Sequence, residues 1–477
     1  MESAMMPEKD DVTAVMEKAH QYGQGHVFKY WDELNDSEKQ QLLNQIKAVD
    51  FELLRRLADE HILEPAEQSV AGVLEPAEII PIPDSDELLQ KADSAGKTGE
   101  KLLRDGKVAA LLVSGGQGTR LGFDGPKGKF PAGPLSNKTL FQLHAEKIIA
   151  MQRRYKTTIP WYIMTSETND AETREFFEEN KYFGLNKKDV IFFTQRMIPA
   201  MDENGKFILD SKHHIFTNPN GHGGTLFSLY DSGSLADMKK RGVEEIFYFQ
   251  VDNVLLRMCD PVFLGYHVQD NAEMSSKVVP KKHPMEKVGV LGIMDGRLSV
   301  VEYSDLSEAE MKATNPDGSL KYDGGNIAIH ILNLKFVEEL VTGKLRLPYH
   351  VAHKKIPYLD EAGQLVEPKK PNGYKFEMFI FDALPFTNDS VVMEVVRDDE
   401  FSPIKNATGD DSPATAKQDL MNHHARMLTK AGVQVPFDSE GNVKGSVEIS
   451  SLFALDERDL KEKIDKTFVF RDNLFLE

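Results

Sequence analysis

The chain has 477 residues, of which 40% are hydrophobic and 28% charged, so it can bury a core without disulfide bonds. At roughly 150 residues per domain, this length predicts about three domains, or one large domain with smaller ones attached. Its single cysteine, Cys259, cannot form a disulfide within the chain. No apolar run approaches the roughly 18 residues of a membrane helix, and the first residues, MESAMMPEKDD, lack a secretory signal pattern. We therefore expect a soluble, cytoplasmic protein.

The charge balance narrows the classes of partner. Lys and Arg number 57 and Asp and Glu number 76, which gives a formal net charge of −19. Nucleic acids and anionic membranes bind to basic surfaces, so neither is an expected partner. A small phosphorylated substrate remains compatible with this charge, because a pocket needs only a few cations and backbone N–H groups.

Residues 1–95 are predicted to form an N-terminal helical region followed by a linker. Apolar residues recur every three or four positions over 12–19, 38–48 and 51–58, as in amphipathic helices. We expect Trp31, Leu53, Leu54 and Leu57 to pack these helices together. Residues 64–86 are rich in Pro, Glu and Ser, which favours an extended linker.

Residues 96–385 are predicted to form an α/β domain. Short apolar runs at 108–113, 161–165, 190–195, 246–252 and 299–304 are typical of strands, and 140–155 and 170–179 are helical in pattern. Alternation of strands and helices favours a mostly parallel, mixed sheet, and continuous apolar runs fit strands covered on both faces. Residues 386–477 are predicted to be a C-terminal satellite domain, with a helix at 413–431 and β-like pieces over 433–470.

The strongest chemical signal is the segment LLVSGGQGTRLGFDGPKGKFP, residues 111–131. A buried strand runs into a glycine-rich turn, which places backbone N–H groups at the carboxyl edge of a sheet, where open α/β folds bind ligands. Glycines at 115, 116, 118 and 122 let the backbone approach a phosphate closely. Arg120 and Lys127 add positive charge, so we expect this loop to bind a phosphorylated ligand.

The spacing excludes the two common phosphate-binding motifs. The residue five positions before Gly128, which precedes Lys129, is Phe123, whereas a Walker P-loop has glycine there. Gly116, Gly118 and Gly122 have one residue too many in the second gap of the Rossmann pattern. A purely structural glycine turn remains the alternative.

Two other strand ends carry polar side chains. Asp252 follows the apolar run IFYFQV, where a carboxylate can help to bind a hard divalent cation together with substrate phosphates, or can simply cap a turn. Asp260 is a competing candidate, but Asp260-Pro261 is more typical of a turn. Gln195 ends another predicted strand, and its amide can both donate and accept hydrogen bonds.

The loop, with GGQGTRLG followed by PKG, resembles the signature of nucleotidyltransferases of the glycosyltransferase-A-like fold. It is most similar to the UDP-sugar pyrophosphorylases, and within them to the UDP-N-acetylhexosamine branch. Further segments extend this resemblance over more than half of the chain. They are FFTQRMIPA (192–200), NPNGHGG (218–224), VDN (251–253), VVEYS (300–304), GGNIAIH (324–330), KKIPY (354–358), PNGYKFEMFIFD (371–382) and EVVRDDEFSPIKNA (394–407).

The resemblance implies a Rossmann-like core and a role for individual residues. The residues implied in catalysis are Arg120, Lys127 and Lys405. Those implied in nucleotide binding are Val113, Ser114, Gly115, Gly116, Gly118, Thr119, Lys127, Gln195, Gly221, Asp252 and Lys375. Those implied in sugar binding are His222, Gly289, Glu302, Tyr303, Asn326, Phe379, Phe381 and Lys405. Asp252 is the implied metal ligand, for Mg²⁺ or Mn²⁺.

The implied reaction is transfer of a uridylyl group from UTP to a sugar 1-phosphate, with pyrophosphate as the second product. The phosphate of the sugar would attack the α-phosphorus in line, so positioning and charge neutralisation would supply most of the catalysis. No nucleic acid or membrane is implied as a partner, and the protein is expected to be a monomer or a weak homo-oligomer.

Two other classes of function remain open at this stage. A nucleotide-sugar-binding regulator without turnover would lose the phosphate cations, which this chain retains. A glycosyltransferase of the same broad fold would typically have a D-x-D motif, whereas here Asp252 is followed by Asn253 and Val254. Histidine pairs at 213/214, 350/353 and 423/424 suggest zinc only weakly, because no cysteine cluster or HExxH motif accompanies them. Cys259 has no evident partnered histidine motif.

The sugar is where the chain departs from the family pattern. His222 stands where the N-acetylhexosamine branch usually has Asn, and histidine there is typical of the UDP-glucose branch. Three other segments (324–330, 375–382 and 402–407) resemble the hexosamine branch, in which aromatic residues matching Phe379 and Phe381 lie near the acetyl group. We therefore expect N-acetylglucosamine 1-phosphate as substrate, with glucose 1-phosphate or broad specificity as the alternative.

Overall fold

The computed structural model describes residues 9–64, 72–343, 346–465 and 467–477. Residues 1–8, most of the stretch inspected for a signal, and 65–71, part of the predicted linker, lie outside these ranges. The chain divides into two compact units. The first consists of Met1–Gly72, Arg196–Gly224 and Leu347–Ile380, and the second of Val73–Gln195, Thr225–Arg346 and Phe381–Glu477. This division differs from three consecutive segments because two distant pieces of chain pack with the N-terminal helices.

The three predicted N-terminal helices are confirmed in the first unit: α1 (Lys9–Gln21), α2 (Asp36–Lys47) and α3 (Phe51–Ala58). Asn35 caps α2 in a capping box with Glu38, and Asp50 caps α3. Their apolar faces share a core with Phe207, Ile215 and Phe376, and with the expected residues Leu54, Leu57, Trp31 and Leu53. This shared core explains why the later segments belong to the first unit.

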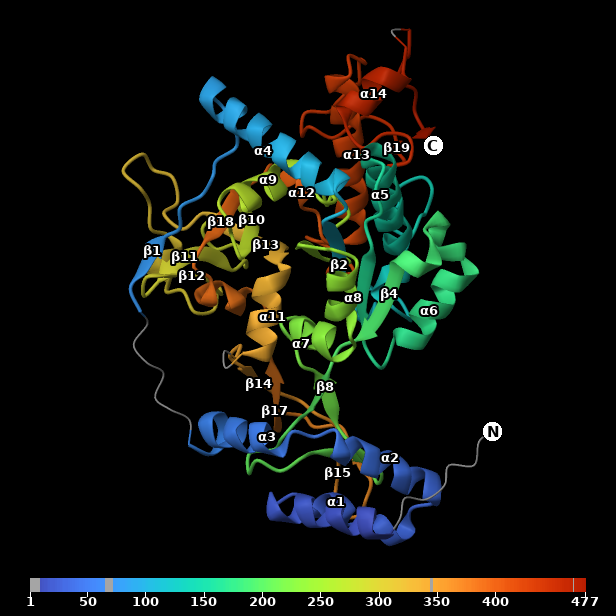
Figure 1. Cartoon of the computed structure of the whole chain (residues 1–477), viewed down its shortest axis with the longest axis vertical. Helices are drawn as coiled ribbons and strands as arrows, with labels where there is room; N and C mark the ends of the chain where they lie inside the picture. Colours follow the sequence, from blue (N-terminus) through green and yellow to red (C-terminus); the bar gives the residue numbers. More distant parts are fainter. Residues whose placement is uncertain (1–8, 65–71, 344–345, 466) are drawn as a thin grey trace. The chain divides into compact units, whose positions relative to one another are not determined.

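Short antiparallel strands complete the first unit (Figure 1). They pair as β5 (Met197–Pro199) with β8 (Thr217–Pro219), β6 (Leu209–Ser211) with β7 (His214–Ile215), β14 (His350–Lys354) with β17 (Gly373–Glu377), and β15 (Tyr358–Leu359) with β16 (Leu365–Val366). None of these short strands was predicted from the sequence.

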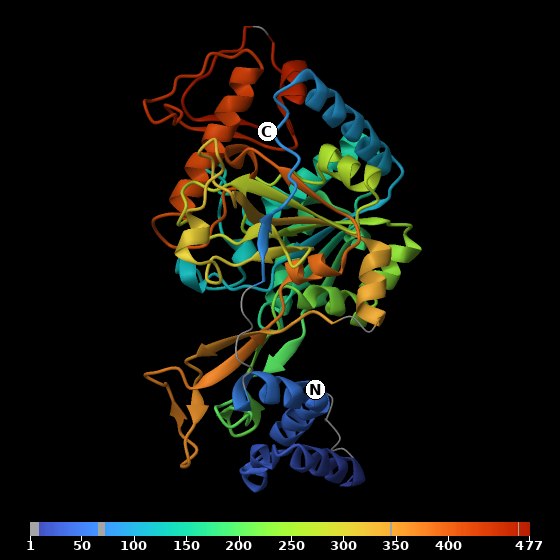
Figure 2. The same cartoon turned by 90° about the vertical axis from the view of Figure 1, so that its left-hand side faces the viewer.

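A mixed sheet of 10 strands forms the centre of the described part of the second unit (Figure 2). Its main path runs β1-β11-β13-β9-β2-β3-β4, with β12 on β11, β10 on β13 and β18 on β10. The strands are β1 (Leu74–Pro76), β2 (Val108–Val113), β3 (Trp161–Thr165), β4 (Val190–Thr194), β9 (Glu245–Gln250), β10 (Met274–Pro280), β11 (Val290–Met294), β12 (Arg297–Val301), β13 (Gly324–Asn333) and β18 (Ser390–Glu394).

One side of this sheet is parallel and the other largely antiparallel. Strands β9, β2, β3 and β4 are parallel neighbours, and they coincide closely with the continuous apolar runs. The residues of β2, β3 and β9 are buried almost throughout, as expected for strands covered on both faces, whereas β4 is buried only at Val190 and Phe193. Strands β1, β11, β12 and β13 pair antiparallel. Strands β10 and β18 form a further parallel pair on that side, and the predicted α/β class with a mixed sheet is confirmed.

Helices pack around the sheet and supply much of its core (Figures 1 and 2). The predicted helices α5 (Leu140–Tyr155), α6 (Asp170–Glu179) and α13 (Pro413–Lys430) are present. The others are α4 (Asp86–Arg104), α7 (Gly224–Asp231), α8 (Ser234–Lys240), α9 (Pro261–Gln269), α10 (Glu308–Met311), α11 (Leu334–Thr342), α12 (Arg397–Glu400) and α14 (Glu457–Lys463). Within the described ranges, no helix combines the length and the apolar character needed to cross a bilayer.

Two predicted boundaries differ from the structure. The predicted linker contains β1, which pairs with β11, and the predicted C-terminal segment begins with β18, which pairs with β10 in the main sheet. The segment that follows has its own small core around α13, with β19 (Val447–Ile449) parallel to β20 (Leu474–Leu476). Strands β1 and β18 obtain their hydrogen bonds from partners far along the chain, and the local sequence pattern does not show such partners.

Candidate functional site

The glycine-rich loop leaves β2 at its carboxyl end and folds back on itself. Gly118 N donates to Gly125 O (2.9 Å), and Lys127 N donates to Gly116 O (3.1 Å). Two short 3-10 turns, Thr119–Leu121 and Lys127–Lys129, form the rest of the loop. Ser114 is buried at its start. The loop is therefore held by its own backbone before any ligand arrives.

Gln195 packs directly on this loop. A Cβ atom at Gly115 would lie 2.4 Å from Nε2 of Gln195, so only glycine leaves room for the amide in this position. Gln195 is buried, and its backbone N–H donates to Thr165 O at the end of β3 (2.9 Å). The loop and Gln195, both predicted to bind the nucleotide, thus lie in close contact.

Lys127 and Asp252 form an ion pair at the same edge of the sheet. The ammonium of Lys127 lies 2.7 Å from Oδ2 of Asp252, and the two side chains are 17% and 11% exposed. Burial acts to raise the pKa of Asp252, but the charges of Lys127 and Lys405 outweigh it, and the pKa lies below its ordinary value. Asp252 is therefore an ionised carboxylate at neutral pH.

Lys405 lies near this ion pair, although it is far from both residues in the sequence. Ile404 N donates to the backbone oxygen of Asp252 (3.0 Å), which brings the two segments together. The ammonium of Lys405 lies 3.6 Å from Asp411, and its side chain is 47% exposed. A cation with this exposure beside an ionised Asp252 is available to an incoming phosphate.

Three of the predicted sugar-binding residues lie together in the second unit. Glu302 follows β12, and its Oε1 lies 2.9 Å from where a Cβ of Gly289 would be. Asn326, in β13, donates its backbone N–H to Gly289 O (2.8 Å), and its Oδ1 accepts from Ala328 N (3.0 Å). Asn326 is thus a strand residue whose side chain is already ordered.

The first unit carries a stack of three rings. Phe379 lies between His222 (5.3 Å between centroids, 22° between planes) and His350 (4.4 Å, 28°). Ile380 N donates to Nδ1 of His222 (3.2 Å), so the proton of the neutral ring is on Nε2. Burial and the neighbouring His350 lower the pKa of His222 to about 4. His222 is therefore a neutral donor at physiological pH.

Gly221 and Lys375 also lie in the first unit. Gly221 has φ of +84°, and a Cβ there would lie 2.3 Å from Met378 O, so glycine is required. The ammonium of Lys375 lies 4.8 Å from the ring centre of Phe216. Burial lowers the pKa of Lys375 below its ordinary value, and the charge of Lys354 acts in the same direction. The charge of Glu377 opposes this shift but does not cancel it.

The remaining predicted site residues differ in their exposure and in the unit to which they belong. Thr119 and Arg120 are exposed on the loop. Tyr303 is 38% exposed although it follows Glu302 directly. Phe381 is only 7% exposed and belongs to the second unit, whereas Phe379 belongs to the first. The aromatic pair expected near the acetyl group is therefore split between the two units.

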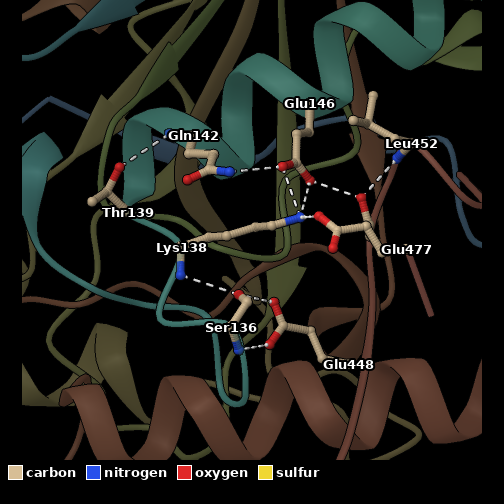
Figure 3. A network of polar contacts seen from close by, with 9 residues as sticks. Ser136, Lys138, Thr139, Gln142, Glu146, Glu448, Leu452 and Glu477 are labelled. Atoms are coloured by element: carbon tan, nitrogen blue, oxygen red, sulfur yellow. Dashed lines mark hydrogen bonds and ion pairs between the residues drawn. The ribbon is translucent and has the colours of Figure 1, made fainter. Parts of the chain in front are cut away.

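Buried carboxylates anchor the chain that leads from the loop into α5 (Figure 3). Glu448 accepts from Leu135 N and Ser136 N, both at 2.7 Å, and from the hydroxyl of Ser136 (2.6 Å). Lys138 pairs with Glu146 (2.8 Å) and with Glu477 (3.0 Å). These contacts tie the C-terminal segment to the chain beyond the loop.

Asp260 and Cys259, the other candidates from the sequence, contribute to the structure of the second unit. Asp260 caps α9 by accepting from Val262 N (3.1 Å) and pairs with buried Lys277, so it begins a helix rather than a turn. Cys259 is buried, and burial raises the pKa of its thiol. Across the described ranges, no group of three or more His, Cys, Asp or Glu side chains is arranged to hold a metal ion.

Sequence reasoning missed several residues that shape this site. Asn253, Glu400 and Lys277 connect the segments of Asp252 and Lys405, and His350 completes the ring stack. Asn253 lies in the segment 251–253, which resembles the family, and His350 belongs to the histidine pair 350/353. Their contacts could not be predicted, because their partners are distant in sequence. Glu400 lies in the segment 394–407, but its partners are also distant in sequence, and Lys277 lies in none of the segments that resemble the family.

Comparisons with known proteins agree along most of the chain. The pattern of the UTP–glucose-1-phosphate uridylyltransferase family matches residues 60–453. The chain is 41% identical to the UDP-N-acetylhexosamine pyrophosphorylase-like protein 1 of Xenopus tropicalis, over 91% of this chain and 88% of that one. It is 33% identical to the UDP-N-acetylglucosamine pyrophosphorylase of Saccharomyces cerevisiae, over 94% and 96%.

A solved structure supports the same assignment. The uridine diphosphate N-acetylglucosamine pyrophosphorylase of Trypanosoma brucei superposes with a TM-score of 0.81 at 29% identity, covering 99% of each chain. The Rossmann-like nucleotidyltransferase fold and the family resemblance indicated by the motifs are thereby confirmed. The chain belongs to the UTP–glucose-1-phosphate uridylyltransferase family.

Proposed function

We propose that the protein is a uridylyltransferase that forms UDP-N-acetylglucosamine and pyrophosphate from UTP and N-acetylglucosamine 1-phosphate. The observation that carries the chemistry is the meeting of Lys127, Asp252 and Lys405 at the carboxyl edge of β2 and β9. The names of the similar proteins favour N-acetylglucosamine over glucose as the sugar.

In this proposal the glycine-rich loop, Arg120 and Lys127 bind the triphosphate, and Gln195 contacts the uracil. Lys405 orients the phosphate of the sugar. One oxygen of that phosphate forms a bond to the α-phosphorus of UTP, while the bond between the α-phosphorus and its bridging oxygen breaks and pyrophosphate leaves. The attacking phosphate is already an anion, so no general base is needed.

The residues present fit Mg²⁺, or Mn²⁺, as the cofactor. Mg²⁺ is usually held by one or two carboxylates together with substrate phosphates and water. Asp252 supplies one ionised carboxylate, and the lack of a three-residue ligand group in the described ranges agrees with such an open arrangement. The bound ion would neutralise charge on the triphosphate and the leaving group.

The sugar-binding residues are proposed in the same terms. Glu302 and Asn326 would bind sugar hydroxyls, and Nε2–H of His222 would donate to an oxygen of the substrate. Tyr303, Gly289 and Phe381 retain their predicted roles as proposals. A monomeric or weakly associated state also remains a prediction, which sedimentation velocity at several concentrations would test.

The direct test is release of pyrophosphate from UTP with each sugar 1-phosphate in the presence of Mg²⁺. We expect turnover with N-acetylglucosamine 1-phosphate and a smaller kcat/KM with glucose 1-phosphate. A protein that binds UDP-sugars but releases no pyrophosphate would be a binding protein, and the proposal would then be wrong.

A further inference from the structure

Asn253, the residue after the proposed metal ligand, joins two segments that are far apart in the sequence. Its amide Nδ2 donates to the backbone oxygen of Glu400 (2.7 Å), and its Oδ1 accepts from Ser402 N (3.0 Å) and Leu255 N (3.3 Å). The side chain is 4% exposed. Both ends of one buried amide are thus used to hold the chain that leads to Lys405.

The backbone on both sides of Asn253 forms a reciprocal pair of hydrogen bonds with the segment before Lys405. Ile404 N donates to Asp252 O (3.0 Å), and Val254 N donates to Ser402 O (3.3 Å). Asn253 itself forms an isolated β-bridge with Pro403. Neither backbone hydrogen bond of this bridge uses the nitrogen of Pro403, and the side-chain hydrogen bonds of Asn253 add further contacts to the same segment.

Glu400, the residue that accepts the hydrogen bond from the Asn253 amide, is itself held in place by an ion pair. Lys277, which is fully buried, pairs with Glu400 (2.5 Å) and with Asp260 (2.7 Å). Glu400 is therefore held by its side chain, while its backbone oxygen accepts from Asn253. A fixed acceptor of this kind lets a single amide determine where the following residues lie.

We propose that Asn253 is a positioning residue that sets Lys405 against Asp252, an inference that rests on the proposed uridylyltransferase function. Asp252 is next to Asn253 in the chain, and Lys405 directly follows Ile404, whose N–H donates to Asp252 O, while the N–H of Lys405 itself donates to Asp411 O (2.7 Å). A change in the hydrogen bonds of Asn253 would move Lys405, which meets the sugar phosphate, relative to Asp252, which lies on the nucleotide side. The distance between two reacting phosphates depends on that relation.

The test is a double-mutant cycle of Asn253→Ala with Lys405→Ala, assayed by pyrophosphate release. We expect N253A to lower kcat by about 10- to 100-fold, with little change in KM for UTP, because the loop and Gln195 are not touched. In the K405A background, N253A should change kcat by less than about threefold, since the cation that it positions is gone. Additive effects, or an unchanged kcat in N253A, would overturn the inference.

Asn422→Ala is the matched control for loss of a buried amide. Asn422 is 8% exposed, donates to Asn442 (2.9 Å) and accepts from Val443 N (2.9 Å), all in the small core of the C-terminal segment. N422A should lower Tm by an amount similar to N253A and leave kcat unchanged. An equal loss of kcat in both variants would make Asn253 merely structural.

A second variant guards against failure of N253A to fold. Asn253→Asp keeps the acceptor for Ser402 N and loses the donor to Glu400 O, and it is judged by the same cycle with K405A. Wild-type protein that releases no pyrophosphate would overturn the proposed function together with this inference. An active wild type whose kcat is independent of Asn253 would overturn the inference alone.

Discussion

Lys127 and Asp252 are 125 positions apart in the sequence, and their charged groups lie 2.7 Å apart at the carboxyl edge of the parallel strands. The pair connects the glycine-rich loop after β2 to the end of β9, the neighbouring strand. Since both side chains are largely buried, an incoming triphosphate has to share Lys127 with the carboxylate. The pair thus holds the glycine-rich loop and the proposed metal ligand together.

Asp252→Asn should lower kcat by on the order of 10² and shift the Mg²⁺ titration to higher concentration. The amide removes the charge that would bind the cation and leaves Lys127 without its partner. Pyrophosphate release across a Mg²⁺ series provides the measurement. Asp317→Asn, in an exposed turn, is the control and should leave the titration unchanged. An unaltered titration in D252N would remove Asp252 from the metal site.

The parallel part of this site could be predicted from sequence, because its signals are local. Continuous apolar runs gave β2, β3, β4 and β9 to within one or two residues, and the polar residues at their ends then had to meet at one edge. The strands β1 and β18 were missed, since each is short and obtains its hydrogen bonds from a partner far along the chain. The position of Lys405 was likewise outside local reasoning, because it depends on Asn253, Glu400 and buried Lys277.

Lys405→Ala should lower kcat by on the order of 10², since it removes a cation from a reacting phosphate. The same variant should make Asp252 easier to protonate, because Lys405 is one of the charges that lower its pKa. The acid limb of the kcat profile should therefore move to higher pH in K405A. Lys417→Ala, a partly exposed lysine of α13, is the control. An unchanged kcat would show Lys405 to be an ordinary surface lysine.

Gly115→Ala should raise KM for UTP about tenfold with little change in Tm. The new methyl group would occupy the place of the Gln195 amide, which has to turn away from the loop. Loss of one well-made hydrogen bond to the base accounts for an effect of about 1.4 kcal/mol. In a Gln195→Ala background the same substitution should add little. Gly96→Ala, where a Cβ meets only an ordinary contact with Val262, is the control.

His144 should make the folded protein sensitive to acid. Its ring is fully buried and its Nε2–H donates to Val251 O (3.0 Å); burial, together with Lys147, lowers its pKa to about 3. The unfolded chain binds a proton near pH 6.5, so stability is fully present above that pH and is lost as pH falls toward 3. At pH 5 the loss is about 2 kcal/mol.

His144→Gln tests this pH dependence. The variant lacks the titrating ring, so its deficit in Tm relative to the wild type should shrink between pH 7 and pH 5. Scanning calorimetry at pH 7, 6 and 5 gives the comparison, with His283→Gln, an exposed histidine, as the control. A deficit that stays constant over this range would mean that His144 does not contribute to the acid sensitivity.

The sugar preference depends on how the ring stack around Phe379 meets its substrate. His222 is neutral above pH 5, its Nδ1 is occupied by Ile380 N, and only Nε2–H can donate to a ligand. Asn at this position would offer both a donor and an acceptor, and it would no longer stack on Phe379. We therefore expect His222→Asn to change discrimination between the two sugars more than it changes KM for UTP.

The measurement is kcat/KM for N-acetylglucosamine 1-phosphate and glucose 1-phosphate, side by side, in the wild type and in His222→Asn. The wild type should prefer the acetylated sugar by about 10- to 100-fold, because an additional apolar group is worth about 1–3 kcal/mol in a pocket. His350→Ala, which removes the other ring from Phe379 and leaves the hydrogen bond of His222, separates the contribution of stacking from that of donation. If glucose 1-phosphate is preferred tenfold or more in the wild type, His222 outweighs the segments that resemble the hexosamine branch, and the proposed substrate is wrong.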